Sequence, residues 1–389
     1  MKVNAQRFLD SFKALQALFP EDGGDEGYNR PAFSAKEQQA HAWVSTQLQQ
    51  SGVLVTHDPI RNTFGRYGQH GGQAIGFGSH LDTVNHGGLY DGAYGTLAAL
   101  EVIRSAAEQA LPLQRDLLFT SFVGEEVNPL GGTFGSRALT GQVAVADNDY
   151  FTAAQIQAAQ LAPQTYRNFL ELHIEQSSAL EQQQFTIGIP TAIAGILRYK
   201  YQFNGAALHA GATPMAYRDD ALVKASRFIQ AVSQQARASS EQLVATVGQL
   251  SVQPNQPTVI PGQVTLILEV RAVDMQVAYQ FQHQLDQWLK AAQIAYHVQK
   301  IVDKLSAQLD PQVQQVIQAA AEQRHDRYTK LFSGANHDVN AMSKIAAAGL
   351  IFVPSHLGIS HNPQEFTTAQ DLVAGLQVLA DSVYALATE

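Results

Sequence analysis

Short, nearly continuous apolar runs alternate along this chain with longer segments whose apolar residues recur at helical spacing. The apolar runs cover residues 74–77, 117–123, 169–172 and 350–353. Runs of this kind are typical of strands that are buried on both faces of a sheet. Helical spacing is clearest in residues 40–48, 97–110 and 372–383. Together these patterns predict an α/β fold in which helices pack on a buried sheet.

Two helices also carry start signals in the sequence. Ser34 followed by Glu37 predicts a reciprocal N-terminal cap for the helix that Gly52 ends, and Thr368 with Asp371 predicts a cap for the last helix. We expect the helix after Ser34 to be scaffold, with a core stripe and no chemical role.

A segment of different character lies between the third and fourth apolar runs. Apolar and polar residues alternate in 199–203 and 264–270, which is the period of a half-exposed antiparallel strand. Helical patterns cover about 220–236 and 277–292. The mixture predicts a smaller α+β domain at 193–303, inserted between the two parts of a larger α/β domain, 1–192 and 304–389. Within it, Glu269 and Arg271 share the polar face of a strand, so Arg271 is available to a ligand or to a neighbouring acid.

Composition narrows the classes of function. The chain has 389 residues, 45% of them hydrophobic and 15% charged, as in ordinary globular proteins. A formal net charge of −9 argues against nucleic acid or an anionic membrane surface as a main partner. No residue is cysteine, so any metal must be held by His, Asp and Glu. The sequence shows neither a signal-peptide pattern nor a membrane-spanning run, and we expect a soluble cytoplasmic protein.

Potential metal ligands follow each of the four apolar runs. In an open α/β sheet, ligands bind where loops at the carboxyl ends of strands converge. Taken singly, each of these residues has an ordinary alternative, such as a hydrogen-bonded turn or a solvated helix start. Five of them at strand ends favour a two-metal site instead. The five candidates are His80, Asp91, Glu126, His173 and His361.

The residue types of this group point to hydrolytic chemistry. Imidazole and carboxylate ligands suit zinc, manganese, cobalt or nickel, and a carboxylate such as Asp91 can bridge two ions. Two ions about 3.5–4 Å apart would lower the pKa of a shared water. Asp82 is placed to orient His80 from behind. The paired acids Glu125 and Glu126 suggest a division of labour, one binding metal and the other acting as general base.

The ordered motifs resemble a known family along nearly the whole chain. Their order is that of the dinuclear amidohydrolases related to aminoacylases and glutamate carboxypeptidases. More narrowly, the chain is similar to the branch that contains N-carbamoyl-L-amino-acid hydrolase, β-ureidopropionase and allantoate amidohydrolase. That branch has a His at the position of His173, where the peptidase relatives usually place an acid. The motifs are Gly78-Ser79-His80-Leu81-Asp82-Thr83, Tyr90-Asp91-Gly92, Glu125-Glu126, Glu171-Leu172-His173-Ile174-Glu175-Gln176, His209-Ala210-Gly211-Ala212-Thr213-Pro214-Met215 and Gly358-Ile359-Ser360-His361.

The resemblance implies a zinc-exopeptidase-like catalytic domain, with a mixed sheet and flanking helices, and an inserted lid and dimerisation domain. It also implies two metal positions that share Asp91. One would be completed by His80 and His173, and the other by Glu126 and His361.

The resemblance implies roles for four further residues. Glu125 would be the general base, and His209 would reach the active site of the partner subunit in a homodimer and stabilise the oxyanion. Arg271 would bind the substrate carboxylate, and Gln176 would line the same pocket.

Three positions depart from the family pattern, all in expected substrate contacts. Thr258 stands where the family normally carries Asn, Ser177 and Ser178 replace Gly-Pro, and Asn336 precedes His337 where Gly is common. None removes a metal ligand, so they bear on specificity.

We therefore expect metal-dependent hydrolysis of a carbamoyl or ureido C–N bond on a small carboxylic acid. Allantoate is the alternative within the same chemistry; its enzymes tend to carry additional Arg near Leu197, where this chain has only Arg198. An N-acyl-amino-acid deacylase or dipeptidase would share the metals but is disfavoured by His173. A non-catalytic relative would keep the fold without turnover.

Overall fold

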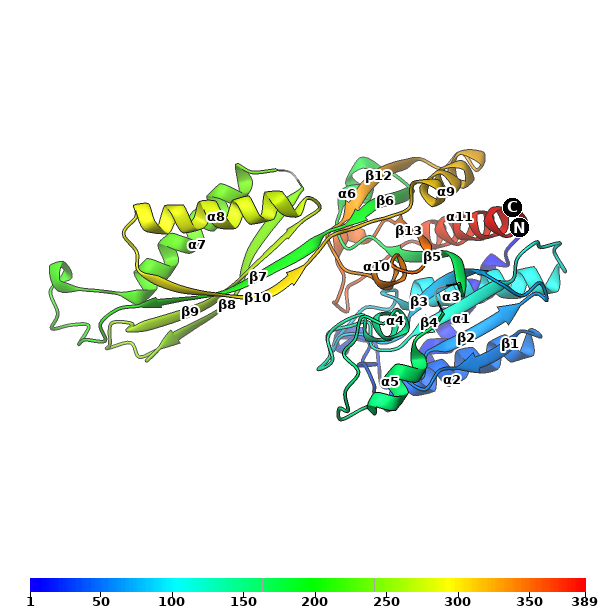
Figure 1. Cartoon of the computed structure of the whole chain (residues 1–389), viewed down its shortest axis with the longest axis horizontal. Coiled ribbons are helices and arrows are strands. Elements are labelled where there is room, and N and C mark those ends of the chain that lie inside the picture. Colours follow the sequence, from blue (N-terminus) through cyan, green and yellow to red (C-terminus); the bar gives the residue numbers. More distant parts are fainter. Residues whose placement is uncertain (163, 241) are drawn as a thin grey trace. The chain divides into compact units, whose positions relative to one another are not determined.

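A computed structural model describes residues 1–162, 164–240 and 242–389 of the chain (Figure 1). These residues form two compact units, Met1–Thr191 with Gln308–Glu389 and Ala192–Ala307. The insertion predicted from the sequence spanned 193–303.

The larger unit is built on a nine-stranded mixed sheet. The strand order is β1-β2-β4-β3-β5-β13-β6-β11, and β12 pairs with β6 off this path. The strands are β1 (Leu54–His57), β2 (Thr63–Tyr67), β3 (Ala74–His80), β4 (Leu117–Phe122), β5 (Tyr166–Ile174), β6 (Ile187–Ile193), β11 (Ala307–Gln308), β12 (Tyr328–Ser333) and β13 (Ala347–Val353).

The centre of this sheet is parallel, and its strands are the four predicted apolar runs. β3 pairs in parallel with β4 and β5, and β5 pairs in parallel with β13. All residues of β3 and β4 are buried, as the apolar runs predicted. Because parallel strands end at the same edge of a sheet, the segments that follow these four strands meet there.

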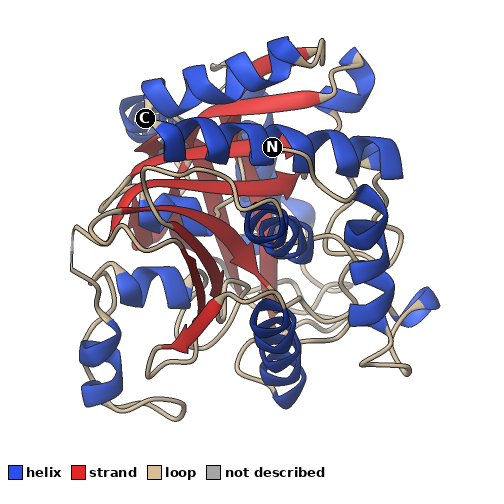
Figure 2. Cartoon of the chain, turned by 90° about the vertical axis from the view of Figure 1, so that its right-hand side faces the viewer, coloured by secondary structure: helices blue, strands red, loops and turns tan. Residues whose placement is uncertain are grey.

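Helices lie around the strands of the larger unit (Figure 2). Side chains of α1, α2, α3, α9 and α11 join the sheet in one apolar core. The predicted repeat for α3 extended to Ala110, but the helix ends at Glu108 and Ala110 has a left-handed φ of 44°. Pro112 follows closely and disfavours helix. The helices are α1 (Ala5–Gln16), α2 (Ala35–Gln50), α3 (Ala93–Glu108), α4 (Phe134–Leu139), α5 (Ala153–Ala159), α6 (Ala179–Gln183), α9 (Pro311–Gln323), α10 (Asp338–Met342) and α11 (Ala369–Thr388).

One prediction about α2 is wrong. The Ser34 side chain accepts a hydrogen bond from the Glu37 amide as expected, but the Glu37 carboxylate does not return to Ser34. It accepts instead from the amides of Phe33 and Gly124, the latter at 2.8 Å. Gly124 precedes Glu125, so α2 supports the turn that carries the candidate base.

The smaller unit is a four-stranded antiparallel sheet in the order β10-β7-β9-β8, with two helices. One face of the sheet packs with the helices in a second apolar core. In β9 every second residue is buried, as the alternation predicted. The elements are β7 (Gly195–Asn204), α7 (Ala221–Arg237), β8 (Leu243–Gln253), β9 (Gln263–Ala272), α8 (Met275–Ala291) and β10 (Tyr296–Lys304).

Among the described residues, no helix combines the length and apolarity needed to cross a membrane.

Candidate metal centre

Five potential ligands come together at the carboxyl edge of the parallel strands. His80 is the last residue of β3, His173 lies at the end of β5, and Glu126 follows β4. His361 follows β13 after a short 3-10 turn, His356–Gly358. Asp91 precedes α3. The structure thus brings together all five residues that the sequence singled out.

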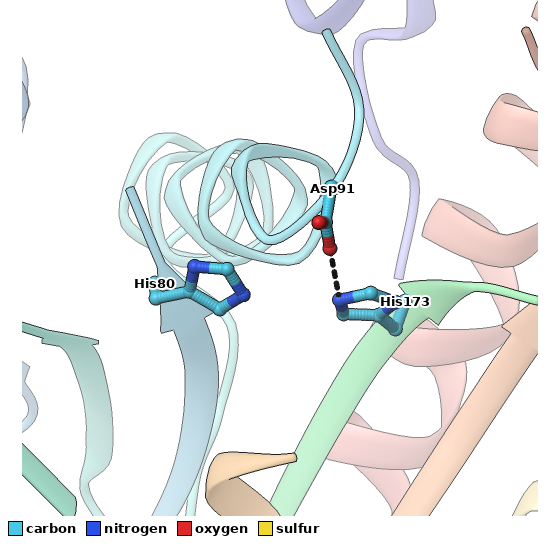
Figure 3. A group of neighbouring side chains, drawn as sticks. All are labelled: His80, Asp91 and His173. Carbon is cyan, nitrogen blue, oxygen red and sulfur yellow. Dashed lines mark ion pairs between the residues drawn. The ribbon is translucent and has the colours of Figure 1, made fainter. Parts of the chain in front are cut away.

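The five side chains form two groups that share Asp91. Candidate ligand atoms of His80, Asp91 and His173 lie within 4.8 Å of one another, and so do those of Asp91, Glu126 and His361. Asp91 Oδ1 lies 3.0 Å from His173 Nε2, and Asp91 Oδ2 lies 3.0 Å from His361 Nε2. Each carboxylate oxygen therefore faces a different group. Figure 3 shows the rings of His80 and His173 below the Asp91 carboxylate, with a dashed line for the close approach of Asp91 and His173.

Glycine at position 92 allows this close approach. Gly92 has a left-handed φ of 59°, and a Cβ there would lie 2.2 Å from the His80 ring. Any other residue would be strained by the backbone angle and would collide with a candidate ligand.

The buried histidines present the same nitrogen to the site. Nδ1 of His80 lies 3.0 Å from the Asp82 carbonyl oxygen, and Nδ1 of His173 lies 2.9 Å from the Ile174 carbonyl oxygen. A carbonyl oxygen can only accept, so Nδ1 carries the hydrogen in both rings. The Gly92 amide donates to His173 Nε2 at 3.3 Å, which places a lone pair on that nitrogen. Both rings therefore offer Nε2 as a metal ligand.

The charges around the site also fit a bound cation. Glu126 Oε1 is buried and has no hydrogen-bond partner among the described residues, although His361 Nε2 lies 3.3 Å away. Burial and the charge of Asp91 raise the pKa of Glu126 to about 7. The hydrogen bond to Asp91 and the nearby Glu126 carboxylate raise the pKa of His361 to about 11. Acids and ring nitrogens at these distances hold a cation well, because a cation neutralises the acids and accepts the lone pairs.

Asp82 lies behind His80, where the sequence placed it, and has a second set of contacts. Its Oδ1 is 3.4 Å from His80 Nδ1. Oδ1 also accepts the amide of Glu125 at 3.1 Å, and Oδ2 accepts that of Glu126 at 3.0 Å. One buried carboxylate therefore touches both the first ligand and the backbone of the acidic pair.

Glu125 lies beside the ligand groups without belonging to either. Its Oε2 is 3.8 Å from His80 Nε2, and its side chain keeps 12% of its surface exposed. Burial raises the pKa of Glu125 well above its usual value, although His80 opposes the shift. A raised pKa suits a carboxyl group that takes up a proton and releases it again.

Gln176 lies next to the second ligand group. Its amide donates to the Ser360 hydroxyl at 3.0 Å and lies 3.4 Å from His361 Nε2. Asn336, one of the departures from the family pattern, contacts Thr133 and Asn340. Ser177 donates to Glu175.

The candidate residues of the smaller unit are brought together in part. His209 forms an isolated bridge with Val259, and the Thr258 carbonyl accepts the Ala210 amide at 2.8 Å, so His209 and Thr258 lie on neighbouring exposed loops. Arg271 lies on the sheet, where its Nε donates to Glu269 at 2.8 Å.

Sequence reasoning missed Glu365. This carboxylate is 6% exposed and accepts hydrogen bonds from the amides of Tyr90 and Asp91 and from the Ser360 hydroxyl. In the sequence, Glu365 is marked only by lying four residues after His361. That spacing does not indicate which groups its carboxylate binds.

The chain is similar to known proteins along most of its length. The sequence model of Peptidase family M20/M25/M40 matches residues 76–385. An N-carbamoyl-L-amino acid amidohydrolase of Geobacillus stearothermophilus is 32% identical over 99% of both chains. An allantoate amidohydrolase of Bacillus subtilis is 31% identical over 93% of both chains. A crystal structure of a hydantoinase/carbamoylase family amidase from Burkholderia multivorans superposes with a TM-score of 0.92 at 29% identity, covering 100% of this chain and 99% of the other.

Proposed function

The chain belongs to Peptidase family M20/M25/M40, and from that membership we propose that it hydrolyses the carbamoyl C–N bond of an N-carbamoyl-L-amino acid or a similar small ureido acid. The observation that carries the proposal is the position of Asp91 between two ligand groups, with Glu125 beside them. The similarity to a carbamoyl-amino-acid amidohydrolase over the full length supports the substrate class.

Two divalent ions are the proposed cofactors, drawn from zinc, manganese, cobalt and nickel. His80, Asp91 and His173 would hold one, and Asp91, Glu126 and His361 the other. Such ions lower the pKa of a water and stabilise negative charge that develops on a carbonyl oxygen.

Glu125 performs the proton transfers of the proposed reaction. Its carboxylate takes a proton from the water that attacks the carbamoyl carbon and gives a proton to the departing amino nitrogen. The C–N bond to the amino acid breaks, and the amino acid leaves with carbamate, which decomposes to ammonia and carbon dioxide. The net reaction consumes one water.

The smaller unit would supply substrate contacts. We assign Arg271 to the substrate carboxylate, because a planar guanidinium binds carboxylates through two hydrogen bonds. Gln176 of the larger unit is assigned to a further substrate contact. Thr258 would offer the substrate one hydroxyl where the family normally has the side-chain amide of Asn.

A homodimer is the proposed assembly, with His209 contributed across the interface. His209 is exposed, and its Nδ1 accepts the amides of Gly211 and Ala212 at 3.1 Å. The hydrogen therefore sits on Nε2, which can donate to an oxyanion. A cytoplasmic location stays a prediction of the sequence.

Allantoate is the second candidate substrate, favoured by the similarity to an allantoate amidohydrolase. Arg198, the basic residue near Leu197, donates to Glu269, which Arg271 also contacts. The acid between the two arginines reduces their joint charge to one, which favours a substrate with a single carboxylate there.

Ammonia release tests the proposal directly. The purified protein, stripped of metal and supplied with Mn²⁺, Zn²⁺, Co²⁺ or Ni²⁺, is assayed with N-carbamoyl-L-amino acids, allantoate, N-acetyl-L-amino acids and dipeptides. We expect metal-dependent ammonia from the carbamoyl amino acids. Ammonia from allantoate alone would select the second candidate. Acetate or amino acids from the last two classes, without ammonia from any ureido acid, would replace the proposal with a deacylase or dipeptidase.

A further inference from the structure

Glu365 joins two segments that carry ligands of both groups. Its Oε1 accepts the backbone amides of Tyr90 at 2.8 Å and Asp91 at 3.0 Å. Its Oε2 accepts the Ser360 hydroxyl at 3.0 Å. Asp91 is the shared ligand and Ser360 adjoins His361, so one buried carboxylate ties the segment before α3 to the loop after β13.

The connection continues toward the substrate side of the site. The Gln176 amide donates to the Ser360 hydroxyl at 3.0 Å. A chain of hydrogen bonds thus runs from Gln176 through Ser360 and Glu365 to the backbone of Asp91. Glu365 itself is not in either ligand group. Its two oxygens already accept three hydrogen bonds, so its contribution is to position other residues.

The two ligand groups differ in how firmly their histidines are held. His80 and His173 lie at strand ends, are 2% exposed and have Nδ1 fixed by backbone carbonyls. His361 lies in a loop, has a left-handed φ of 55° and is 45% exposed. The group of Asp91, Glu126 and His361 therefore depends more on contacts that fix its loop.

We propose that Glu365 is a positioning residue that holds the group of Asp91, Glu126 and His361 in the geometry that binds a divalent cation. The group of His80, Asp91 and His173 does not require it to the same degree. This inference rests on the proposed function, because it assumes that both groups bind cations. The inference predicts which of the two cations binds more weakly when the hydrogen bonds of Glu365 are removed.

Gly88 offers a way to break the tie without changing a charge. A Cβ at position 88 would lie 2.1 Å from the carboxyl carbon and Oε1 of Glu365. The carboxylate is fixed by three hydrogen bonds, so it must leave at least one of them to make room. Gly88→Ala and Glu365→Gln therefore disturb the same contacts by different means, one steric and one electrostatic.

The experiment titrates metal-free protein with Mn²⁺ and follows the heat of binding and the number of bound ions. We expect wild-type protein to bind two equivalents. We assign the second, weaker equivalent to the group of Asp91, Glu126 and His361. In Glu365→Gln and Gly88→Ala this equivalent should bind about 10–100-fold more weakly, which is the usual loss when a contact behind a metal ligand is removed. The affinity of the first equivalent should change by less than about threefold. No substrate or turnover is involved in this measurement.

Glu101→Gln is the matched control. Glu101 is 1% exposed in the same unit, lies in α3 and also accepts a backbone amide, that of Asn4 at 2.8 Å. The loss of a buried carboxylate there should lower stability and leave both equivalents at wild-type affinity.

Three results would overturn the inference. Wild-type affinity for both equivalents in Glu365→Gln and Gly88→Ala would refute it and leave the proposed function intact. Equal weakening of both equivalents would show that Glu365 acts on the whole site. Wild-type protein that binds no cation would refute the inference and the proposed function together. If the two variants do not fold, Ser360→Ala decides, because it cuts the tie to the His361 loop and leaves the contacts of Glu365 with the Tyr90 and Asp91 amides in place. It also removes the acceptor of the Gln176 amide, which belongs to the same chain of hydrogen bonds. Its second equivalent should weaken, and wild-type binding would refute the inference.

Discussion

The carboxylate of Asp82 accepts the backbone amide of Glu126 at 3.0 Å, which ties the end of β3 to the turn after β4. The same carboxylate lies 3.4 Å from His80 Nδ1 and accepts the Glu125 amide at 3.1 Å. The fully buried side chain of Asp82 therefore contacts the candidate ligand His80 and the backbone of both Glu125 and Glu126.

Asp82→Asn tests this arrangement. The amide keeps the shape of the side chain but has only one acceptor oxygen, so one of the two backbone amides loses its partner. We expect metal affinity to fall by about 10–100-fold and activity to fall with it. Calorimetric titration with Mn²⁺ and the ammonia assay measure the two effects.

Asp116→Asn is the control for Asp82→Asn. Asp116 is 1% exposed, accepts the amides of His70 and Gly71 and lies just before β4, at the opposite end from Glu125. This variant should lose stability with metal affinity unchanged. Equal metal affinity in the two variants would contradict the role of Asp82.

Glu125 and Glu126 are predicted to fail in different ways. Glu125→Gln removes the proton acceptor and should lower kcat by about 10²–10⁴-fold while both equivalents of metal still bind. Glu126→Gln removes a ligand and should weaken the second equivalent. Metal counting and steady-state kinetics on both variants separate the roles. A Glu125→Gln protein that turns over at the wild-type rate would exclude Glu125 as the base, and a wild-type protein that binds metal without turnover on any substrate would indicate a non-catalytic relative.

His41 should make stability depend on pH away from the metal centre. Its Nδ1 lies 3.0 Å from Thr63 Oγ1, and burial, with a smaller effect of His57, lowers the pKa of His41 to about 4. Unfolded histidine has a pKa of about 6.5, so between these values the unfolded chain binds the extra proton. The stabilisation is present above pH 6.5 and is lost as the pH falls toward 4, by up to about 3 kcal/mol for a fully buried ring.

His41→Gln isolates this effect because glutamine does not titrate. Urea unfolding with EDTA present, at pH 7.5 and pH 4.5, should show a smaller loss of unfolding free energy in the variant than in wild type. The comparison between variants matters, since the raised pKa values of Glu126 and Glu365, each about 7, act in the opposite direction in both proteins. Equal losses in the two proteins would show that the His41 ring is protonated in the folded state.

The sequence predicted those strands whose burial leaves a clear pattern of hydrophobic residues. Strands buried on both faces read as apolar runs, and their common direction brought His80 and His173 to one edge. The outer strands β8 and β10 were not predicted, because most of their side chains are exposed and show little alternation.

Contacts between side chains and distant backbone amides left no trace in the sequence. Glu365 binds amides 274 and 275 positions away, and any acid in the loop after β13 would have the same local pattern. Glu37 suggested a cap because of its spacing from Ser34, yet its carboxylate stabilises the Gly124 turn. Such contacts depend on tertiary structure, which local spacing does not encode.

Whether His209 acts across a subunit interface can be decided by combining two inactive variants. His209→Ala should remove the oxyanion donor, and Glu125→Gln the base. In a heterodimer of these variants, the chain that keeps Glu125 receives the intact His209 of its partner if the contribution is made between subunits. Co-expression with two different tags allows the heterodimer to be purified, and size-exclusion chromatography shows that it is a dimer. We expect about half of the wild-type rate, because one of two symmetric sites is complete. If His209 served its own subunit, both sites would lack a group and the heterodimer would be as inactive as either variant alone.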